Sequence, residues 1–416
     1  MRKLAWVLLV VFVFAIPWEY SLDLGAPFGN AARIAGLLVL IVAVPAALQA
    51  GRVRTPGMMQ WLVLALYLWL CATYLWTIDG AATLAKMRGN FQELMIVWLV
   101  WEFAETPFDL KVLLRAFIAG SWVLAILTLA NFSSPEAIAE GQYRFVAYGQ
   151  DPNDVARFLD LGFPLTALLV GCERRWPARI LAAGYLPLGL AAVLLTASRG
   201  GFIAALAALL GTTVILFRGH ARAAVGALLA LPAVAALLWF AVPAETIERL
   251  ATIPAQLRHG DLNQRVNIWS AGWRAFVHAP VFGTGAGTFT DAAHLSPIDT
   301  AHNTALSLVV SGGLCALFLA MVVLVLAVRN VAQMRAPLRL TFAVALLVWG
   351  VTAGVASVEE SRTAWFLLAV IALAARLGQE SPSRLEACFT PNSRAPCLAF
   401  ESVRRCAGGV TYHVTM

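Results

Sequence analysis

Runs of apolar residues long enough to cross a bilayer recur along the whole chain, separated by short stretches that contain Pro, Gly and charged residues. A spanning helix needs roughly 20 mostly apolar residues. Because 60% of the 416 residues are hydrophobic and only 13% are charged, the apolar side chains exceed what one soluble core would bury. We therefore predict an all-α, polytopic integral membrane protein with about twelve transmembrane helices. The predicted spans cover residues 4–17, 32–49, 58–76, 90–104, 110–130, 155–172, 178–197, 201–217, 222–242, 303–328, 338–356 and 363–376.

The basic residues predict the orientation of these spans. Arg2 and Lys3 precede the first span, which lacks a small-residue cleavage site and is expected to remain as an anchor with a cytoplasmic amino terminus. Residues 1–376 then form one transmembrane domain with a periplasmic loop at 243–302. An even number of spans returns residues 377–416 to the cytoplasm as a tail that we expect to be disordered, since it lacks helical periodicity. The net charge of +7 suits loops over anionic lipid and does not indicate nucleic-acid binding.

This topology leaves an excess of basic residues on the outer side of the membrane. Cations near a membrane usually pair with carboxylates or mark a substrate path. We expect Arg249 and Arg362 to pair with nearby carboxylates or to be solvated. The outer-side basic residues are Arg33, Lys86, Arg88, Arg144, Arg157, Arg199, Arg249, Arg258, Arg265, Arg274 and Arg362.

Arg199 lies in "LLTASRGGF", a connection of a few residues between two predicted spans, where two glycines permit a turn and close helix approach. The topology places Arg88 and Arg144 at a similar depth, so several guanidinium groups are predicted to converge. Guanidinium presents a planar fork of donors that matches phosphate oxygens. A lipid-linked phosphate is the expected anion, although Arg88 and Arg144 are equally compatible with contact to lipid headgroups.

The loop at 243–302 contains one amphipathic pattern and one glycine-rich turn. In "NQRVNIWSAGWRAFVHAP", the spacing of Arg265, Ile268, Trp269 and Phe276 predicts a helix that Asn263 caps and Pro280 ends. Such a face suits the bilayer interface or the underside of a lid better than direct sugar stacking. The following "GTGAGTF" has no preceding strand and is predicted to be a tight turn, not a dinucleotide site.

His302 lies where the loop enters the tenth predicted span. We expect Asp299 or Thr300 to cap that helix and His302 to occupy its first turn, where the helix amino terminus would keep the imidazole neutral and able to accept a proton. Asn303 could hold a substrate oxygen beside it. A histidine that only bonds the loop across the helix end is the alternative. Neither His-x-x-x-His nor Asp-x-Asp spacing occurs, so no metal site is predicted.

The segments "RVNIWSAGWRAFVHAPVFGTGAGTF" and "AHNTALSLVVSGG" together resemble the signature of the O-antigen ligase and polymerase superfamily. The family's H-N-x9-G pattern falls on His302, Asn303 and Gly313, and its "SRG" turn falls on Arg199. "GQDPNDVARFL" is similar to the family's Asn-bearing entry to a middle span, at Asn153. Ala316 stands where many ligases have Gly, Thr or Tyr, which is a small departure.

The resemblance implies a metal-independent, inverting glycosyltransferase that uses no cofactor. It would transfer O-antigen glycan from undecaprenyl pyrophosphate to a hydroxyl of the lipid A core, at the periplasmic face of the Gram-negative inner membrane, during lipopolysaccharide biosynthesis. His302 would be the general base, and Arg199 and Arg265 would hold the pyrophosphate and stabilise the leaving charge. The predicted substrate-binding residues are Arg88, Arg144, Asn153, Asn303 and Trp269.

Three alternatives stay open on the sequence alone. An O-antigen polymerase would use the same donor with a second lipid-linked chain as acceptor. A protein O-oligosaccharyltransferase usually has a longer periplasmic carboxyl-terminal extension than this chain shows. A lipid or solute transporter would use its arginines to line a path, but such proteins commonly contain paired inverted repeats, which we do not find here.

Overall fold

A computed structural model describes residues 1–25, 29–51, 53–132, 144–219, 242–260, 264–297 and 299–390. Within these ranges the chain is helical, and its only extended pairing is an isolated bridge between Asp23 and Asn30. The prediction of an all-α fold is confirmed. The elements are α1 (Arg2–Ala15), η1 (Ile16–Ser21), α2 (Ala31–Gln49), α3 (Met58–Ala72), η2 (Thr73–Leu75), α4 (Gly80–Phe103), α5 (Pro107–Phe132), α7 (Pro152–Cys172), α8 (Trp176–Leu195), α9 (Arg199–Gly219), α11 (Ala244–Ala251), α12 (Ile253–His259), α13 (Arg265–His278), α14 (Phe289–Ala292), α15 (Thr304–Gln333), α16 (Leu338–Ala353), η3 (Val358–Glu360), α17 (Arg362–Glu380) and α18 (Pro382–Phe389).

Nine helical segments in the described part of the chain are long and apolar enough to cross a membrane, which makes this a polytopic membrane protein. They begin at Arg2, Ala31, Met58, Pro107, Pro152, Trp176, Arg199, Thr304 and Arg362. The apolar α16 is shorter, and α4 is long but carries Lys86, Arg88 and Glu93. The predicted span at 222–242 lies outside the described residues, except for its last residue. The count of twelve therefore stays a prediction.

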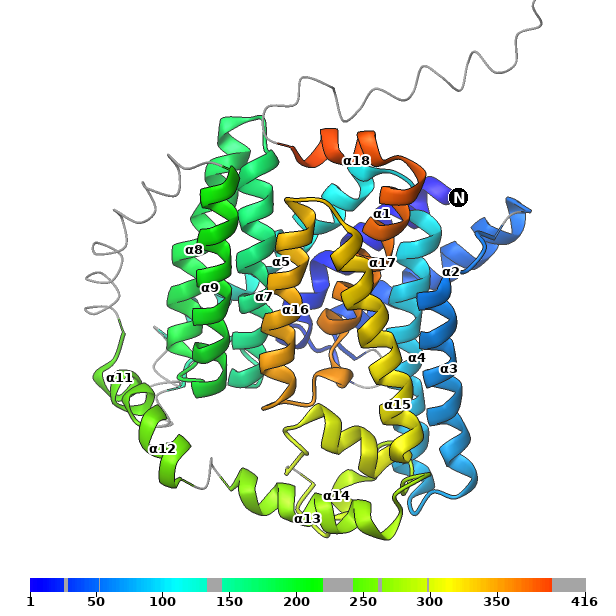
Figure 1. Cartoon of the computed structure of the whole chain (residues 1–416), viewed down its shortest axis with the longest axis vertical. Helices are drawn as coiled ribbons and strands as arrows, with labels where there is room; N and C mark the ends of the chain where they lie inside the picture. The colour runs from blue at the N-terminus through cyan, green and yellow to red at the C-terminus, as the bar shows by residue number, and fades with distance from the viewer. Residues whose placement is uncertain are drawn as a thin grey trace, which may run out of the picture.

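Helices α7 and α17 form the centre of the bundle. Of the most apolar window of α7, 94% is buried, because α8, α9 and α16 pack around it. Figure 1 shows the long helices running side by side, with α11 to α14 at the end opposite the amino terminus and α18. We call the end that carries α11 to α14 the loop face. This arrangement puts the residues of the 243–302 loop at one end of the bundle.

The chain after residue 376 differs from the prediction of a tail without structure. Residues 377–380 complete α17, and α18 packs against α5, α7 and α17. Leu385, Cys388 and Phe389 are buried there, so apolar side chains at helical spacing stabilise α18. The Ser and Pro residues around them led to the prediction of a disordered tail. The remainder of the predicted tail, 391–416, lies outside the described residues.

The glycine-rich turn packs against a break in α15. Gly313 has a φ of +69° and interrupts the helix, and a Cβ on it would lie 2.0 Å from the carbonyl oxygen of Val281. The amide nitrogens of Thr284 and Gly285 donate to the carbonyl oxygens of Val310 and Ser311, at 2.8 and 3.0 Å. The turn thus returns the loop to the bundle as predicted, and backbone contact explains why glycine occupies position 313.

Candidate active site

The turn before α9 is fixed to the start of α7 by side-chain hydrogen bonds. Ala197 adopts a φ of +49°, and the hydroxyl of Ser198 donates to Oδ1 of Asn153 at 2.8 Å. The same hydroxyl oxygen accepts a bond from the amide of Gly201 at 3.1 Å. A Cβ on Gly201 would lie 2.3 Å from Cβ of Ala156, so glycine permits the close approach of α9 to α7. These contacts point Arg199 out of a rigid turn.

Four arginines line one pocket beside this turn, on the loop face. Arg144, Arg199 and Arg265 were predicted to act together, whereas Arg249 was expected to be paired or solvated. They come from the segment before α7 and from α9, α11 and α13, and all four are half-buried. Among the described residues no carboxylate forms an ion pair with Arg144, Arg249 or Arg265. We call this the arginine pocket.

Backbone carbonyls orient the guanidinium groups in the arginine pocket. Nε of Arg199 donates to the carbonyl oxygen of Arg249 at 3.3 Å, and Nε of Arg249 donates to that of Ala197 at 3.2 Å. Arg144 donates to the carbonyl of Thr196 and to Oδ1 of Asn153, each at 3.3 Å. These bonds hold the guanidinium groups of Arg144, Arg199 and Arg249 in place around the pocket.

The arginines repel one another across the pocket. Burial, together with the positive charges of Arg249, Arg265 and Arg199, lowers the pKa of Arg144 to about 10. Burial also lowers the pKa of Arg265. Among the described residues, the carboxylate that acts on both is Asp151, which caps α7. Both arginines stay charged near neutral pH, so an arriving anion relieves this repulsion and gains several donors at once.

His302 does not line the arginine pocket itself, but the charge of Arg265, which does, acts on its imidazole. His302 also does not lie in the first helical turn as predicted. Asn303 caps α15 by accepting a bond from the amide of Leu306 at 2.9 Å, so His302 precedes the cap, with a φ of +44°. Burial and the charge of Arg265 lower the pKa of the half-buried imidazole. The prediction of a neutral histidine therefore holds for a different reason: desolvation and a neighbouring cation, in place of a position within the helix amino terminus.

Trp269 and Asn303, two of the predicted substrate-binding residues, form hydrogen bonds that hold the backbone on either side of His302. Nε1 of Trp269 donates to the carbonyl of Ala301 at 3.1 Å, which ties α13 to the residue before the histidine. Besides capping α15, Asn303 donates from Nδ2 to the carbonyl of Gly354 at 3.4 Å. Both residues hold the site together, and contact with substrate stays a prediction for each.

Arg88 does not join the other predicted arginines. It lines a separate groove between α2 and α4, together with Arg33. The pairing expected for Arg362 is confirmed, since it bonds to Glu19. Two further outer-side cations are also paired: Lys86 with Glu360 at 2.6 Å, and Arg157 with Asp154 at 3.0 Å. Of the basic residues predicted on the outer side, three thus form ion pairs, four line the arginine pocket, and Arg33 and Arg88 line the separate groove.

Backbone strain concentrates around the arginine pocket. Within the described residues, positive φ values outside glycine occur at Ala197, Gln264, His294 and His302. Three of these directly precede or form the site: Ala197 before the Ser198–Arg199 turn, Gln264 before Arg265, and His302 itself. Residues held in such conformations cluster at active sites, where the surrounding structure has to maintain them.

Sequence reasoning did not assign a site role to Arg249 or Asp151. Arg249 lies on a short amphipathic helix whose position in the fold could not be inferred from the sequence. The sequence pattern at Asp151 indicates only the cap of a helix that begins with Pro152. No group of three or more His, Cys, Asp or Glu side chains in the described part of the chain could hold a metal ion.

Comparison with known families identifies the segment that carries most of this site. Residues 184–321 match the sequence model of the family described as O-Antigen ligase, a range that includes Arg199, Arg249, Arg265 and His302. The search of curated proteins gives no match. The family has glycosyl-transfer activity in O-antigen pathways, with a lipid-linked glycan donor and an acceptor. Through residues 184–321, the chain is similar to the O-antigen ligase family.

Proposed function

We propose that the protein is an O-antigen ligase that transfers glycan from undecaprenyl pyrophosphate to a hydroxyl of the lipid A core. The observation that carries this proposal is the arginine pocket beside His302. Four guanidinium groups are suited to a pyrophosphate, and a neutral imidazole next to them is suited to accept a proton. A pocket that gathers four guanidinium groups also favours an anion over a neutral ligand, since the positive charges repel one another.

In the proposed reaction, His302 accepts the proton of the acceptor hydroxyl as its oxygen attacks the anomeric carbon of the donor. A new glycosidic C–O bond forms while the bond between that carbon and the pyrophosphate oxygen breaks. Attack from the face opposite the leaving group inverts the anomeric carbon. Arg144, Arg199, Arg249 and Arg265 stabilise the negative charge that develops on the pyrophosphate, so the chemistry needs no metal ion to supply positive charge.

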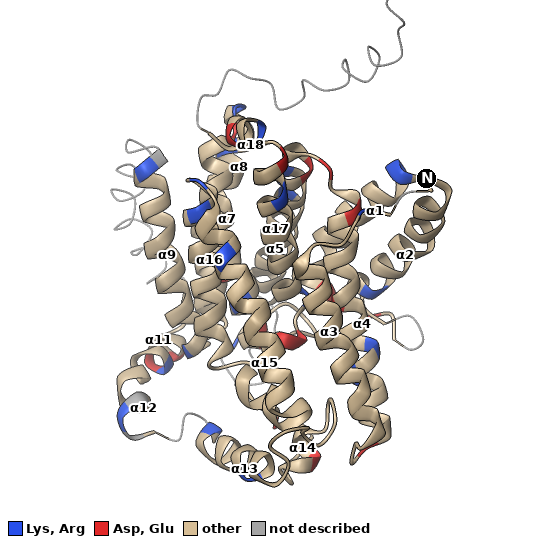
Figure 2. Cartoon of the chain, turned by 45° about the vertical axis from the view of Figure 1, so that its right-hand side comes forward, with Lys and Arg blue, Asp and Glu red and all other residues tan. Residues whose placement is uncertain are grey.

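We place the reaction at the periplasmic face of the Gram-negative inner membrane. Figure 2 shows basic residues at the ends of helices near the amino terminus and α18, which supports a cytoplasmic location for that end. The arginine pocket opens at the other end of the bundle, on the loop face. A donor whose pyrophosphate lies at the outer membrane surface would reach it without crossing the bilayer.

The proposal is tested with the full chain purified in lipid, undecaprenyl-pyrophosphate glycan, lipid A core and a chelator. We expect glycan to appear on the lipid A core with wild type but not with His302→Ala. Chain growth on undecaprenyl would instead identify a polymerase. Folded protein that makes neither product but moves the lipid across the bilayer would replace the proposal with a transporter.

A further inference from the structure

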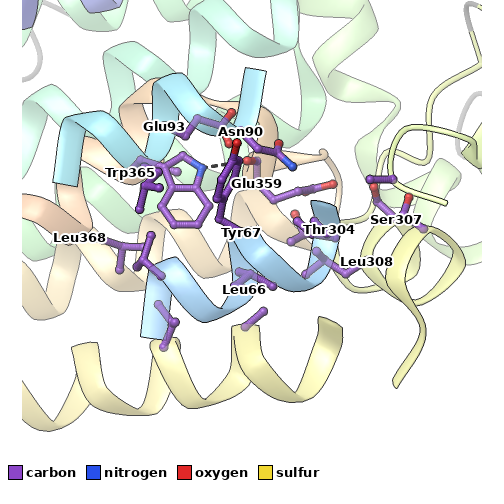
Figure 3. Close-up of a pocket in the computed structure, with 18 of the residues that line it drawn as sticks. Leu66, Tyr67, Asn90, Glu93, Thr304, Ser307, Leu308, Glu359, Trp365 and Leu368 are labelled. Carbon is purple, nitrogen blue, oxygen red and sulfur yellow. Dashed lines mark hydrogen bonds between the residues drawn. The ribbon is translucent and has the colours of Figure 1, made fainter. Parts of the chain in front are cut away.

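A second pocket, lined by carboxyl groups in place of arginines, lies between α3, α4, α15 and α17. Its polar end carries Asn90, Glu93, Ser307 and Glu359 (Figure 3). Its other walls are mostly apolar and aromatic, and include Tyr67, Leu308 and Trp365. We call this the carboxylate pocket. The proposed reaction assigns it no role.

Polar atoms of this pocket lack partners within the described residues. Neither carboxylate oxygen of Glu359 accepts a well-formed hydrogen bond, although Ser307 lies beside it. Nδ2 of Asn90 has no partner either, on a residue that is only 8% exposed. Glu93 is 6% exposed and lines the same space. Because an unpaired buried polar group costs about 1–3 kcal/mol, several in one pocket indicate a ligand that completes them.

The ligand that fits this polar end is a hydrogen-bond donor. Lys86 also lines the pocket, but its ammonium is paired with Glu360. Glu93 and Glu359 therefore face the space as acceptors, and Asn90 can both donate and accept. Vicinal hydroxyls of a sugar match this set, and the rings of Tyr67 and Trp365 offer faces to its C–H groups.

The two pockets share a wall that His302 adjoins. Val355 lines the arginine pocket, and Glu359, four positions later, lines the carboxylate pocket. The start of α15 is fastened to this wall: the hydroxyl of Thr304 donates to the carbonyl of Ala356 at 2.9 Å and accepts from the amide of Val358 at 3.0 Å. His302 lines neither pocket, but it lies two residues before Thr304, the residue that fastens α15 to this wall.

We propose that the carboxylate pocket binds the hydroxyl-bearing head of the acceptor amphiphile, with Glu93, Glu359 and Asn90 as its hydrogen-bond acceptors and donor. This inference rests on the proposed function and adds the acceptor subsite to it. The apolar walls take the aliphatic part of the acceptor. The donor and the acceptor then approach the general base from opposite sides of one wall, and the different polar groups of the two pockets keep each in its own pocket.

The test measures the KM for the acceptor and the KM for the donor separately in the variants Glu93→Gln and Glu359→Gln. Both changes keep side-chain shape but weaken acceptance of hydroxyl hydrogen bonds, so we expect the KM for lipid A core to rise about tenfold in each. The KM for the undecaprenyl-pyrophosphate donor should stay within twofold. Glu380→Gln, in an ion-paired glutamate at the far end of α17, is the matched control and should change neither KM. A neutral alkyl glycoside should compete with lipid A core in wild type and less well in the two variants.

An unchanged acceptor KM in folded variants, or equal rises in both KM values, would overturn the acceptor subsite. A fall in kcat alone would also overturn it, because that outcome means that the carboxylates support the base without binding substrate. If Glu359→Gln does not fold, Glu93→Gln decides. Absence of transfer by wild type would instead refute the proposed function, so the two failures are distinguishable.

Discussion

The arginine pocket can be compared with the ion pairs that Arg362 and Lys86 form, which we call the ion-paired cluster. The predicted topology places the cations of both regions on the outer side of the membrane, but their partners differ. In the ion-paired cluster, Arg362 meets Glu19 and Lys86 meets Glu360. In the arginine pocket, guanidinium groups face one another and bond mainly to backbone carbonyls. Paired cations hold helices together, whereas four guanidinium groups gathered around one pocket indicate a site for an anion.

The largest effect should come from the residue that adjoins the arginine pocket and carries no permanent charge. We expect His302→Ala to lower kcat by about 10² to 10⁴, the usual contribution of a general base, with little change in donor binding. Turnover on lipid A core measures this. His294→Ala, at an exposed loop histidine outside the pocket, is the control. A folded His302→Ala protein with near-normal turnover would exclude the role.

Within the pocket, shape should matter as well as charge. Arg265→Lys keeps the positive charge but loses the planar fork, so kcat/KM for the donor should fall about tenfold or more. Arg274→Lys, on the same α13 helix but outside the pocket, should behave as wild type. Equal activity of Arg265→Lys and wild type would remove Arg265 from the pyrophosphate site.

A stability measurement sharpens the comparison between the two regions. Arg362→Gln leaves Glu19 buried without its cation, so the free energy of unfolding should fall by about 3–5 kcal/mol while the remaining folded protein still binds donor. Arg144→Gln should lose less stability, because removal of one charge relieves repulsion from Arg249, and should lose donor binding. Thermal unfolding and donor binding of both variants measure this. If Arg362→Gln instead loses donor binding and Arg144→Gln loses more stability, the roles assigned to these two arginines are wrong.

The smallest effect expected is a shift in the pH profile. Because burial and Arg265 lower the pKa of His302 below 6.5, the base form persists to lower pH, and activity should decline only as pH falls below that value. Arg265→Gln removes the neighbouring cation and should move this acid limb upward. The pH dependence of kcat/KM over roughly pH 5 to 8 checks both. If the acid limb does not move in Arg265→Gln, the charge of Arg265 does not affect the pKa of His302.

The helices could be predicted because their apolar runs are long and their ends carry Pro, Gly or capping residues. Eleven of the twelve predicted spans coincide with helices in the described residues, and Arg144, Arg199 and Arg265 line one pocket. The prediction that Arg88 joins the other arginines was wrong, because the depth of a residue in the membrane does not specify which side of its helix faces the site. The cap of α15 was placed too early because Asp299, Thr300 and Asn303 are all suitable capping residues, and only the fold selects among them.

The carboxylate pocket could not be found from sequence. Asn90 and Glu93 lie on α4, while Ser307 and Glu359 are more than two hundred residues away, and no motif links them. Buried polar residues on apolar helices were the available signal, but their partners depend on helix packing. The tail was misjudged at 377–390 for a related reason: the stabilisation of α18 comes from tertiary contact.

The most direct test of the central claim is equilibrium binding of undecaprenyl-pyrophosphate glycan to wild type, Arg144→Gln, Arg265→Gln and His302→Ala, with transfer measured on the same samples. If the arginine pocket holds the pyrophosphate beside a general base, the two arginine variants lose donor affinity, and His302→Ala binds the donor but does not transfer it. Donor affinity that is unchanged in both folded arginine variants would contradict the account.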